Sequence, residues 1–467
     1  MGLRKELEKY ADKGMVSFHM PGHKGKLDPI DLTELPDLDD LYDPDGMIED
    51  ALKRAAAVYG SEHCFYLVNG STVGVLTAVS AGVTKGGHMI MQRGSHKSAY
   101  HAAILRDIKL SYIFEDCDEI CGAGLGVSLS SVKEAVLKDP EAEAVFLTSP
   151  SYEGFCAELE EIAAYLHSAD KKLIVDAAHG AHFALCSEFP QCAVAAGADY
   201  VVMSLHKTLP CPNQAALLHV KGDPSKAAAF LSIYQTTSPS YPLMAAMDDC
   251  INARYDWEGF ILRRRKLSEQ LKGLKNIRVR DAFDGHPDRS PEICKMMLCP
   301  ADGVSGIRLH EELRLRGIEP EMSLPAYVLL ICSVADTDED HKKLAEAVKD
   351  IDSSWQTGER SAARDEGHKV NEAGDHAGVF DDKYSIRCIK NVSTAMSLSD
   401  AWEAEAEDAL LAEAAGRISA GTVMAYPPGR PILLPGEQIT AGCIEEIFRL
   451  LRSGCSIKGI SMWTKRM

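Results

Sequence analysis

Two short segments of the sequence carry the residue types that Schiff-base chemistry needs. Asp176 closes the apolar run KLIVD, and Lys207 follows the apolar run YVVMS within the segment SLHKTLP. A lysine that attacks an aldehyde must first lose its proton, and partial burial at a strand end lowers its pKa. A carboxylate at a neighbouring strand end can keep a pyridinium nitrogen protonated, so that the ring accepts electrons. The pair predicts a pyridoxal 5'-phosphate site with Lys207 as the covalent anchor.

Lys24 and Lys97 also follow a histidine, so the choice of Lys207 rests on its position. Lys24 lies in the Pro-Gly turn of FHMPGHKG, where no strand would fix it, and Lys97 begins a predicted helix. Of the three lysines, only Lys207 directly follows a predicted strand, and that strand is the next one after the strand of Asp176. Ligands of parallel sheets bind beyond the carboxyl ends of the strands, which favours Lys207.

The elements that would position these residues alternate between residues 60 and 220. Segments with apolar residues near helical spacing separate the short apolar runs HMIMQ, IKLSYIF, AVFLTSP, KLIVDAA, YVVMSLH and QAALLHV. Nearly continuous apolar strands that alternate with helices predict an α/β fold with a mainly parallel sheet, covered on both faces. Asp176 and Lys207 would then lie at the same edge of one sheet.

The remaining sequence predicts further units around this large domain, which we place at residues 61–260. Residues 1–60 have the composition of an irregular N-terminal arm, and residues 261–351 predict a small α/β domain. Residues 352–378 are polar and nearly free of aliphatic side chains, which is typical of a linker or surface loop. Residues 379–467 would form a C-terminal domain that is mainly helical.

The composition narrows the class of protein. The 467 residues are 46% hydrophobic and 25% charged, as in a globular protein of two or three domains. The formal net charge of −19 disfavours nucleic acids and anionic membranes as partners. No apolar run approaches the roughly 18 residues of a membrane span, and the first residues lack a secretory signal pattern. The 14 cysteines contain no CxxC pair, which predicts reduced thiols in a cytoplasmic protein.

Eight motifs along the chain carry a resemblance to a known family. In order, they are FHMPGHKG, DLYDPDGMI, YLVNGST, RGSHKSAYHA, SPSYEG, VDAAHGAHF, SLHKTLP and YPPGRPILLPGE. Over nearly its whole length the sequence resembles the Orn/Lys/Arg decarboxylase family, and most of all the short Gram-positive arginine and lysine decarboxylases. The resemblance implies the large domain of fold-type-I pyridoxal-phosphate enzymes with smaller C-terminal α/β domains. It also implies decarboxylation of a basic amino acid, arginine first and lysine or ornithine next, in polyamine biosynthesis.

The resemblance implies catalytic roles at the matched positions. Lys207 would form the Schiff base, Asp176 would pair with the pyridine nitrogen, and His96 would stack on the ring. His179 would lie near the cofactor in a less defined role.

The resemblance further implies a cradle for the cofactor phosphate. Gly70, Ser71 and Thr72 precede or open a predicted helix, where free N–H groups and the helix dipole favour an anion. Ser204 and His206 would add phosphate contacts beside the lysine.

Fold-type-I sites usually lie at a dimer interface, so the resemblance implies at least a homodimer. Glu34 and Asp39 of the arm would be the residues that reach the neighbouring site.

Taken singly, these residues also have structural explanations. Asp176 could cap a loop, the NGST segment could be an ordinary helix N-cap, and His96 could be a surface histidine. His179 and His182 could form a metal pair, but no glutamate follows the first histidine, and we predict no metal site. All of them together fit a single cofactor.

Three departures from the family pattern bear on the substrate. Ala177 replaces the glutamate of DEAHG, Leu324 replaces the aspartate that follows Glu321-Met322-Ser323, and the DPxK element is blurred in DRSPEICK. A dibasic substrate needs an acidic or hydrogen-bonding partner at its distal end. Another fold-type-I enzyme, such as an aminotransferase or a β-eliminating lyase, or a catalytically inactive cofactor-binding regulatory homologue, therefore stays open.

Overall fold

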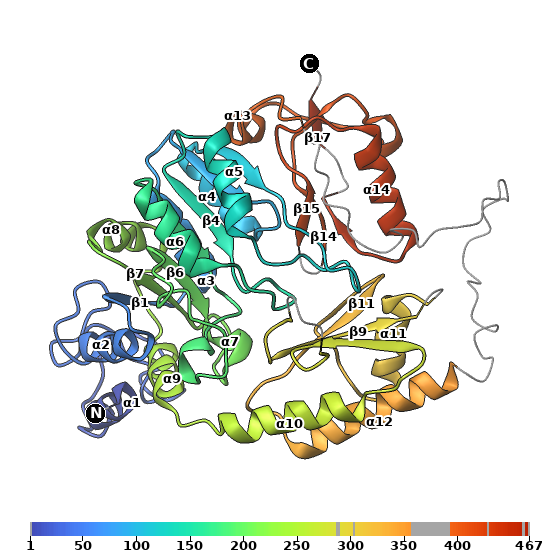
Figure 1. The fold of residues 1–467 in the computed structure, drawn as a ribbon. Coiled ribbons are helices and arrows are strands. Elements are labelled where there is room, and N and C mark those ends of the chain that lie inside the picture. Colours follow the sequence, from blue (N-terminus) through green and yellow to red (C-terminus); the bar gives the residue numbers. More distant parts are fainter. Residues whose placement is uncertain are drawn as a thin grey trace, which may run out of the picture.

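A seven-stranded sheet forms the centre of the large domain (Figure 1). The computed structural model describes residues 2–285, 290–301, 304–355, 393–426, 429–459 and 463–465. The strand order is β1-β7-β6-β5-β4-β2-β3. The strands are β1 (His63–Leu67), β2 (His88–Gln92), β3 (Lys109–Ile113), β4 (Ala144–Thr148), β5 (Lys172–Asp176), β6 (Tyr200–Ser204) and β7 (Ala216–Val220). The strands from β6 to β3 are parallel and β7 is antiparallel to both its neighbours, which confirms the mainly parallel sheet.

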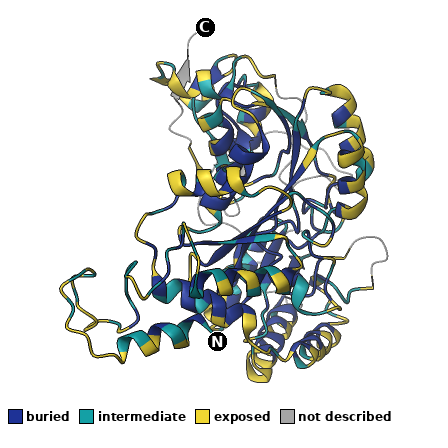
Figure 2. Ribbon diagram, turned by 90° about the vertical axis from the view of Figure 1, so that its left-hand side faces the viewer, coloured by how far each residue is buried: buried dark blue, intermediate teal, exposed yellow. Residues whose placement is uncertain are grey.

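Helices bury both faces of this sheet, as the apolar strands predict. Successive residues of β5 alternate between the faces: Leu173 and Val175 join one core cluster, and Ile174 joins the other. One face is covered by α3 (Ser71–Gly82), α4 (Lys97–Arg106) and α8 (Ser225–Tyr234). The other face is covered by α2 (Met47–Tyr59), α5 (Leu129–Lys138), α6 (Leu159–Ser168) and α9 (Tyr241–Asn252). In Figure 2 the strands are accordingly dark blue and the outer sides of the helices yellow.

The N-terminal region is more ordered than the predicted irregular arm. It contains α1 (Leu3–Ala11), which packs against α9, and α2, which packs against the sheet. Asp39 is buried, and its Oδ2 accepts hydrogen bonds from the N–H groups of Gly46, Ile48 and Glu49 at the start of α2. Asp39 is therefore engaged within its own chain, and the expectation that it reaches a neighbouring site is wrong; Glu34 remains a prediction.

A second, smaller domain follows the large one. Its antiparallel sheet has the order β10-β11-β9-β8. The strands are β8 (Ile277–Asp281), β9 (Lys295–Pro300), β10 (Met322–Leu324) and β11 (Tyr327–Ile331), and the helices are α10 (Trp257–Gln270), α11 (Gly306–Leu315) and α12 (Asp338–Ser354). Since α12 runs to Ser354, the predicted linker at 352–378 starts too early, and its part from 356 onward lies outside the described residues.

The C-terminal region mixes strands and helices, so the expectation of a mainly helical domain is wrong. Its elements are α13 (Leu398–Glu403), β12 (Glu407–Asp408), β13 (Ile418–Ser419), β14 (Val423–Ala425), β15 (Arg430–Leu433), α14 (Ala441–Arg452), β16 (Ile457–Lys458) and β17 (Trp463–Lys465). Strands of two to four residues are too short to produce a periodic signal in the sequence. A buried ion pair joins this region to the large domain, with Arg93 Nη2 2.9 Å from Glu437 Oε2.

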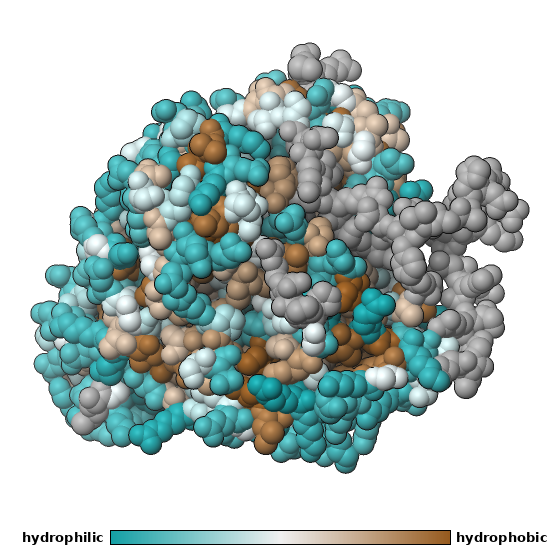
Figure 3. Space-filling view, viewed as in Figure 1, coloured by the Kyte–Doolittle hydropathy of each residue, from teal (hydrophilic) through white to brown (hydrophobic). Residues whose placement is uncertain are grey.

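Hydrophilic side chains dominate the face shown in Figure 3, with smaller hydrophobic areas between them. Every helix in the described part of the chain is too short or too polar to act as a membrane span.

Candidate active site

A cavity of about 360 Å³ opens beyond the carboxyl ends of the parallel strands. Its wall holds most of the residues that the sequence analysis singled out, together with polar residues that it did not. The singled-out residues in the wall are Gly70, Ser71, Thr72, His96, Asp176, His179, His206 and Lys207.

Asp176 and Lys207 reach this cavity from adjacent strands. Asp176 is the last residue of β5, which pairs in parallel with β6, and Lys207 lies in the short helix α7 (Leu205–Thr208) directly after β6. Asp176 is buried and its Oδ1 accepts a hydrogen bond of 3.1 Å from the N–H of Ala178. The expectation that the acid and the lysine share one edge of the sheet is confirmed.

The surroundings of Lys207 favour loss of its proton. Burial lowers the pKa of Lys207, while the negative charges of Asp176 and Glu321 oppose that shift. Its Nζ lies 3.3 Å from Nε2 of His179. A lysine in this setting is suited to attack an aldehyde.

The residues predicted to bind an anion lie at the start of α3, in the cavity wall. Gly70 has a φ of +78°, which glycine adopts without strain, and no side chain caps the helix that begins at Ser71. The first N–H groups of a helix have no partner within it, and here the hydroxyls of Ser71 and Thr72 stand beside them in the cavity wall. At Gly74 an added Cβ would lie 2.5 Å from Leu67 Cδ1, so α3 packs close against the sheet. This arrangement fits a phosphate group.

The two flanking histidines differ in their surroundings. His96 is the N-cap of α4, where its Nδ1 accepts from the N–H of Ser98, and its side chain is exposed towards the cavity. His206 donates from Nδ1 to the carbonyl of Ala215 at 3.1 Å, and it also lines the cavity. Ser204 is fully buried and does not line the cavity, so the structure does not bring its hydroxyl to the cradle.

His179 lies between two lysines, one of which the sequence analysis missed. Its Nε2 faces Lys207, and its Nδ1 accepts a hydrogen bond of 2.8 Å from Nζ of Lys295. Lys295 is fully buried at the start of β9. The altered DPxK element contained this lysine, but its spacing alone does not reveal a contact with the large domain.

Three further polar residues extend the site along the ends of β2, β3 and β4. Gln92 Nε2 donates to Glu115 Oε1 at 2.6 Å, and Gln92 Oε1 accepts from the N–H of Thr148 at 2.8 Å. All three side chains line the cavity. Gln92 and Thr148 each end a strand of the parallel sheet, as Asp176 does. The position that favoured Asp176 as a site residue therefore also favours these two. Glu115 supplies a second carboxylate.

The replaced family positions do not face this cavity. Ala177 and Leu324 are both buried within hydrophobic clusters, and neither belongs to the cavity wall. Tyr152 does line the wall, and its hydroxyl donates to Glu321. The cavity thus keeps carboxylates although two acidic positions of the family pattern are lost.

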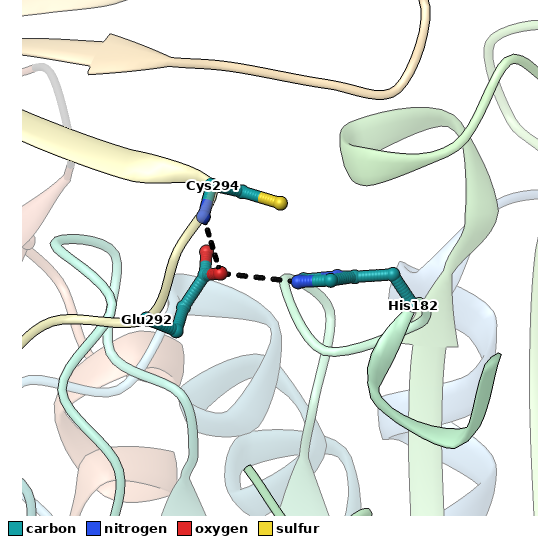
Figure 4. A group of neighbouring side chains, drawn as sticks. All are labelled: His182, Glu292 and Cys294. Carbon is teal, nitrogen blue, oxygen red and sulfur yellow. Dashed lines mark hydrogen bonds and ion pairs between the residues drawn. The ribbon is translucent and has the colours of Figure 1, made fainter. Parts of the chain in front are cut away.

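Two groups of possible metal ligands occur among the described residues. Their members are His182, Glu292 and Cys294, and Cys332, Asp336 and His341. In the first group His182 Nε2 lies 3.1 Å from Glu292 Oε2, which also accepts from the N–H of Cys294 (Figure 4). His179 belongs to neither group, since its two nitrogens face lysines, so a metal pair with His182 does not form.

Comparison with family models agrees with this geometry. The model described as Orn/Lys/Arg decarboxylase, major domain, matches residues 26–293, and the model for the C-terminal domain matches residues 382–456. The chain belongs to the Orn/Lys/Arg decarboxylase family. Enzymes of this family are amino-acid decarboxylases, and the family implies pyridoxal 5'-phosphate as cofactor.

Relatives and solved structures of this decarboxylase cover nearly the whole chain. The arginine decarboxylase of Bacillus subtilis is 31% identical over 485 residues, which cover 97% of this chain and 94% of the relative. The uncharacterized protein YaaO of Bacillus subtilis is 31% identical over 484 residues, with 98% and 95% covered. The solved structure of lysine decarboxylase A from Pseudomonas aeruginosa superposes with a TM-score of 0.81 at 18% identity, covering 99% of this chain and 80% of that one. The fold is that of fold-type-I pyridoxal-phosphate enzymes.

Proposed function

We propose that this decarboxylase converts a basic amino acid, arginine in the first place and lysine or ornithine next, to the corresponding amine and CO₂. The observation that carries the proposal is the meeting of Lys207, Asp176 and the start of α3 in one cavity. When bound there, pyridoxal 5'-phosphate supplies an electron sink for the electrons released as the bond from Cα to the carboxylate breaks. The names of the arginine decarboxylases among the relatives support arginine as the first substrate to test.

The predicted residues of the cavity would each contribute one task. Lys207 would hold the cofactor covalently, and the Asp176 carboxylate would keep the ring nitrogen protonated. Ser71 and Thr72 would bind the phosphate, and His96, at the open side of the cavity, would stack on the ring.

A proton must reach Cα once CO₂ has left. Lys207 Nζ and His179 Nε2 are 3.3 Å apart in the cavity wall and form the group best placed to deliver it. The buried Glu115 would face the distal cation of a basic substrate, since a carboxylate is the partner that such a cation needs.

The substrate is tested by incubating the cofactor-loaded enzyme separately with arginine, lysine and ornithine. We expect equal amounts of CO₂ and amine from each substrate that reacts, with the highest kcat/KM for arginine, because the substrate loses a carboxylate and gains a proton at Cα. Formation of a keto acid without CO₂ would identify an aminotransferase instead. Binding of all three amino acids without any product would identify an inactive homologue.

We also infer a homodimer, in which residues 15–27 of one protomer lie against the other. This segment exposes five large apolar side chains: Met15, Val16, Phe18, Met20 and Leu27. The Phe18 side chain is 94% exposed, an arrangement that a contact with a second copy would relieve.

Sedimentation of the wild type is expected to give a dimer, and the F18D variant is expected to dissociate at about tenfold higher protein concentration. A charge at a buried contact weakens association, whereas the L137D variant, on the exposed face of α5, serves as the control. A monomeric wild type would contradict the homodimer.

A cytoplasmic location is part of the same proposal. Thirteen cysteines in the described residues are free thiols, and most of them are buried. Free thiols are typical of a reducing compartment, which supports this location.

A further inference from the structure

A chain of three side chains crosses from the small domain to the anchor lysine of the large domain. Lys295 Nζ lies 2.8 Å from His179 Nδ1, and His179 Nε2 lies 3.3 Å from Lys207 Nζ. Lys295 and His179 are both buried, so water does not compete for these contacts. The ring of Tyr152 packs edge-on against His179, with ring centroids 4.7 Å apart, and limits rotation of the imidazole.

The chemistry of these groups sets the direction of each hydrogen bond. Burial, reinforced by the charge of Lys295, lowers the pKa of His179 well below its ordinary value, so the ring is neutral. A neutral imidazole has one N–H donor and one acceptor nitrogen. An ammonium can only donate, so Lys295 in its charged form makes Nδ1 the acceptor, and the proton of His179 then resides on Nε2. That N–H points at Lys207, which can accept it only as an unprotonated amine.

The carboxylate of Glu292 acts electrostatically on Lys295. Burial acts to raise the pKa of Glu292, but His182 and Lys295 keep it below its ordinary value, so Glu292 remains a carboxylate. Figure 4 shows Glu292 fixed by His182 and by the backbone of Cys294. Burial lowers the pKa of Lys295, and the Glu292 charge opposes that shift. The ammonium form of Lys295 is part of the inference drawn below.

Packing leaves the Lys295 stem little freedom. At Gly154, where φ is +98°, an added Cβ would lie 2.6 Å from Lys295 Cγ. The N–H of Glu292 donates to the carbonyl of Gly154 at 2.9 Å, so the start of β9 is tied to the loop beneath the cavity. Close packing between the two domains therefore positions Lys295 beside His179.

We propose that Lys295 is a positioning residue, which fixes the tautomer of His179 and thereby holds Lys207 as a free amine. The inference rests on the proposed role of Lys207 as the cofactor anchor. The other charged or titratable groups near Lys207 are Asp176, Glu321, His96 and His206. The two carboxylates favour the ammonium of Lys207, whereas burial and the N–H of His179 favour the free amine.

The test measures the protonation of Lys207 directly, in the full-length protein without cofactor or substrate. Trace acetylation with acetic anhydride across a pH series, read by mass spectrometry against an added standard amine, gives the pKa of Lys207. In K295M, His179 can place its proton on Nδ1 and accept from a Lys207 ammonium. We expect Lys207 labelling near neutral pH to fall about tenfold, which corresponds to a rise of about one pKa unit. The K97M variant removes an exposed lysine beside His96 and is expected to leave Lys207 labelling unchanged.

Circular dichroism and thermal unfolding first establish that K295M is folded. Labelling of Lys207 in folded K295M within twofold of the wild type would overturn the proposal. If K295M does not fold, the pKa of Lys207 in the wild type is the test. A Lys207 pKa no lower than that of the standard amine would overturn the proposal. The readout needs no turnover, so failure of the decarboxylase assay and failure of this inference remain distinguishable.

Discussion

Replacing Lys207 with alanine is expected to lower kcat for decarboxylation by about 10³-fold or more and to make pyridoxal phosphate removable by dialysis. The variant loses the amine that holds the cofactor and that helps to return the proton to Cα. The measurement combines CO₂ release with the absorbance of the protein after dialysis. The fold should persist, because Lys207 lies in the cavity wall and supports no other element through a side-chain hydrogen bond besides that to His179 among the described contacts.

The K97A variant is the matched control, since Lys97 also follows a histidine and lies near the same cavity but is exposed at the start of α4. We expect it to keep its cofactor and most of its activity. Activity of K207A close to that of the wild type, or loss of the cofactor in K97A alone, would contradict the assignment of the anchor.

The Asp176→Asn substitution is expected to lower kcat by about 10³-fold while KM changes little. Asparagine has nearly the same shape and can still accept from the N–H of Ala178, but it cannot stabilise a protonated ring nitrogen. Steady-state kinetics with the preferred substrate measures this effect. The result depends on charge rather than on packing, because only the carboxylate is removed.

The D199N variant provides the control at the opposite end of the sheet. Asp199 precedes β6, and its Oδ2 accepts from the N–H of Leu173 at 2.7 Å, far from the carboxyl ends of the strands. We expect its kcat to stay within about threefold of the wild type. A D176N enzyme with kcat equally close to the wild type would show that Asp176 is not needed to keep the ring nitrogen of the cofactor protonated.

The part of the fold with strong periodicity was predictable from the sequence. The apolar runs of the large domain correspond to β2 through β7, because strands buried on both faces need nearly continuous apolar residues. β1 was not predicted, since it joins the sheet through the antiparallel β7, and its partner is set by tertiary contacts. The short C-terminal strands likewise depend on their neighbours rather than on their own pattern.

The candidate site was predictable where a residue follows a strand of the central sheet. Asp176 and Lys207 met this condition, and Gln92 and Thr148 meet it too. Lys295 could not be found this way, because it comes from another domain and reaches His179 only through the packing of β9 against the Gly154 loop. Contacts between domains carry no local sequence pattern, so the tautomer of His179 required the structure.

The central claim is the covalent attachment of the cofactor to Lys207, and borohydride reduction tests it most directly. The purified, cofactor-loaded enzyme is reduced, digested and analysed by mass spectrometry. We predict a pyridoxyl group on the peptide that contains Lys207. A pyridoxyl group on Lys295, Lys97 or Lys24 instead, or an enzyme that releases CO₂ without any pyridoxyl peptide, would contradict the account.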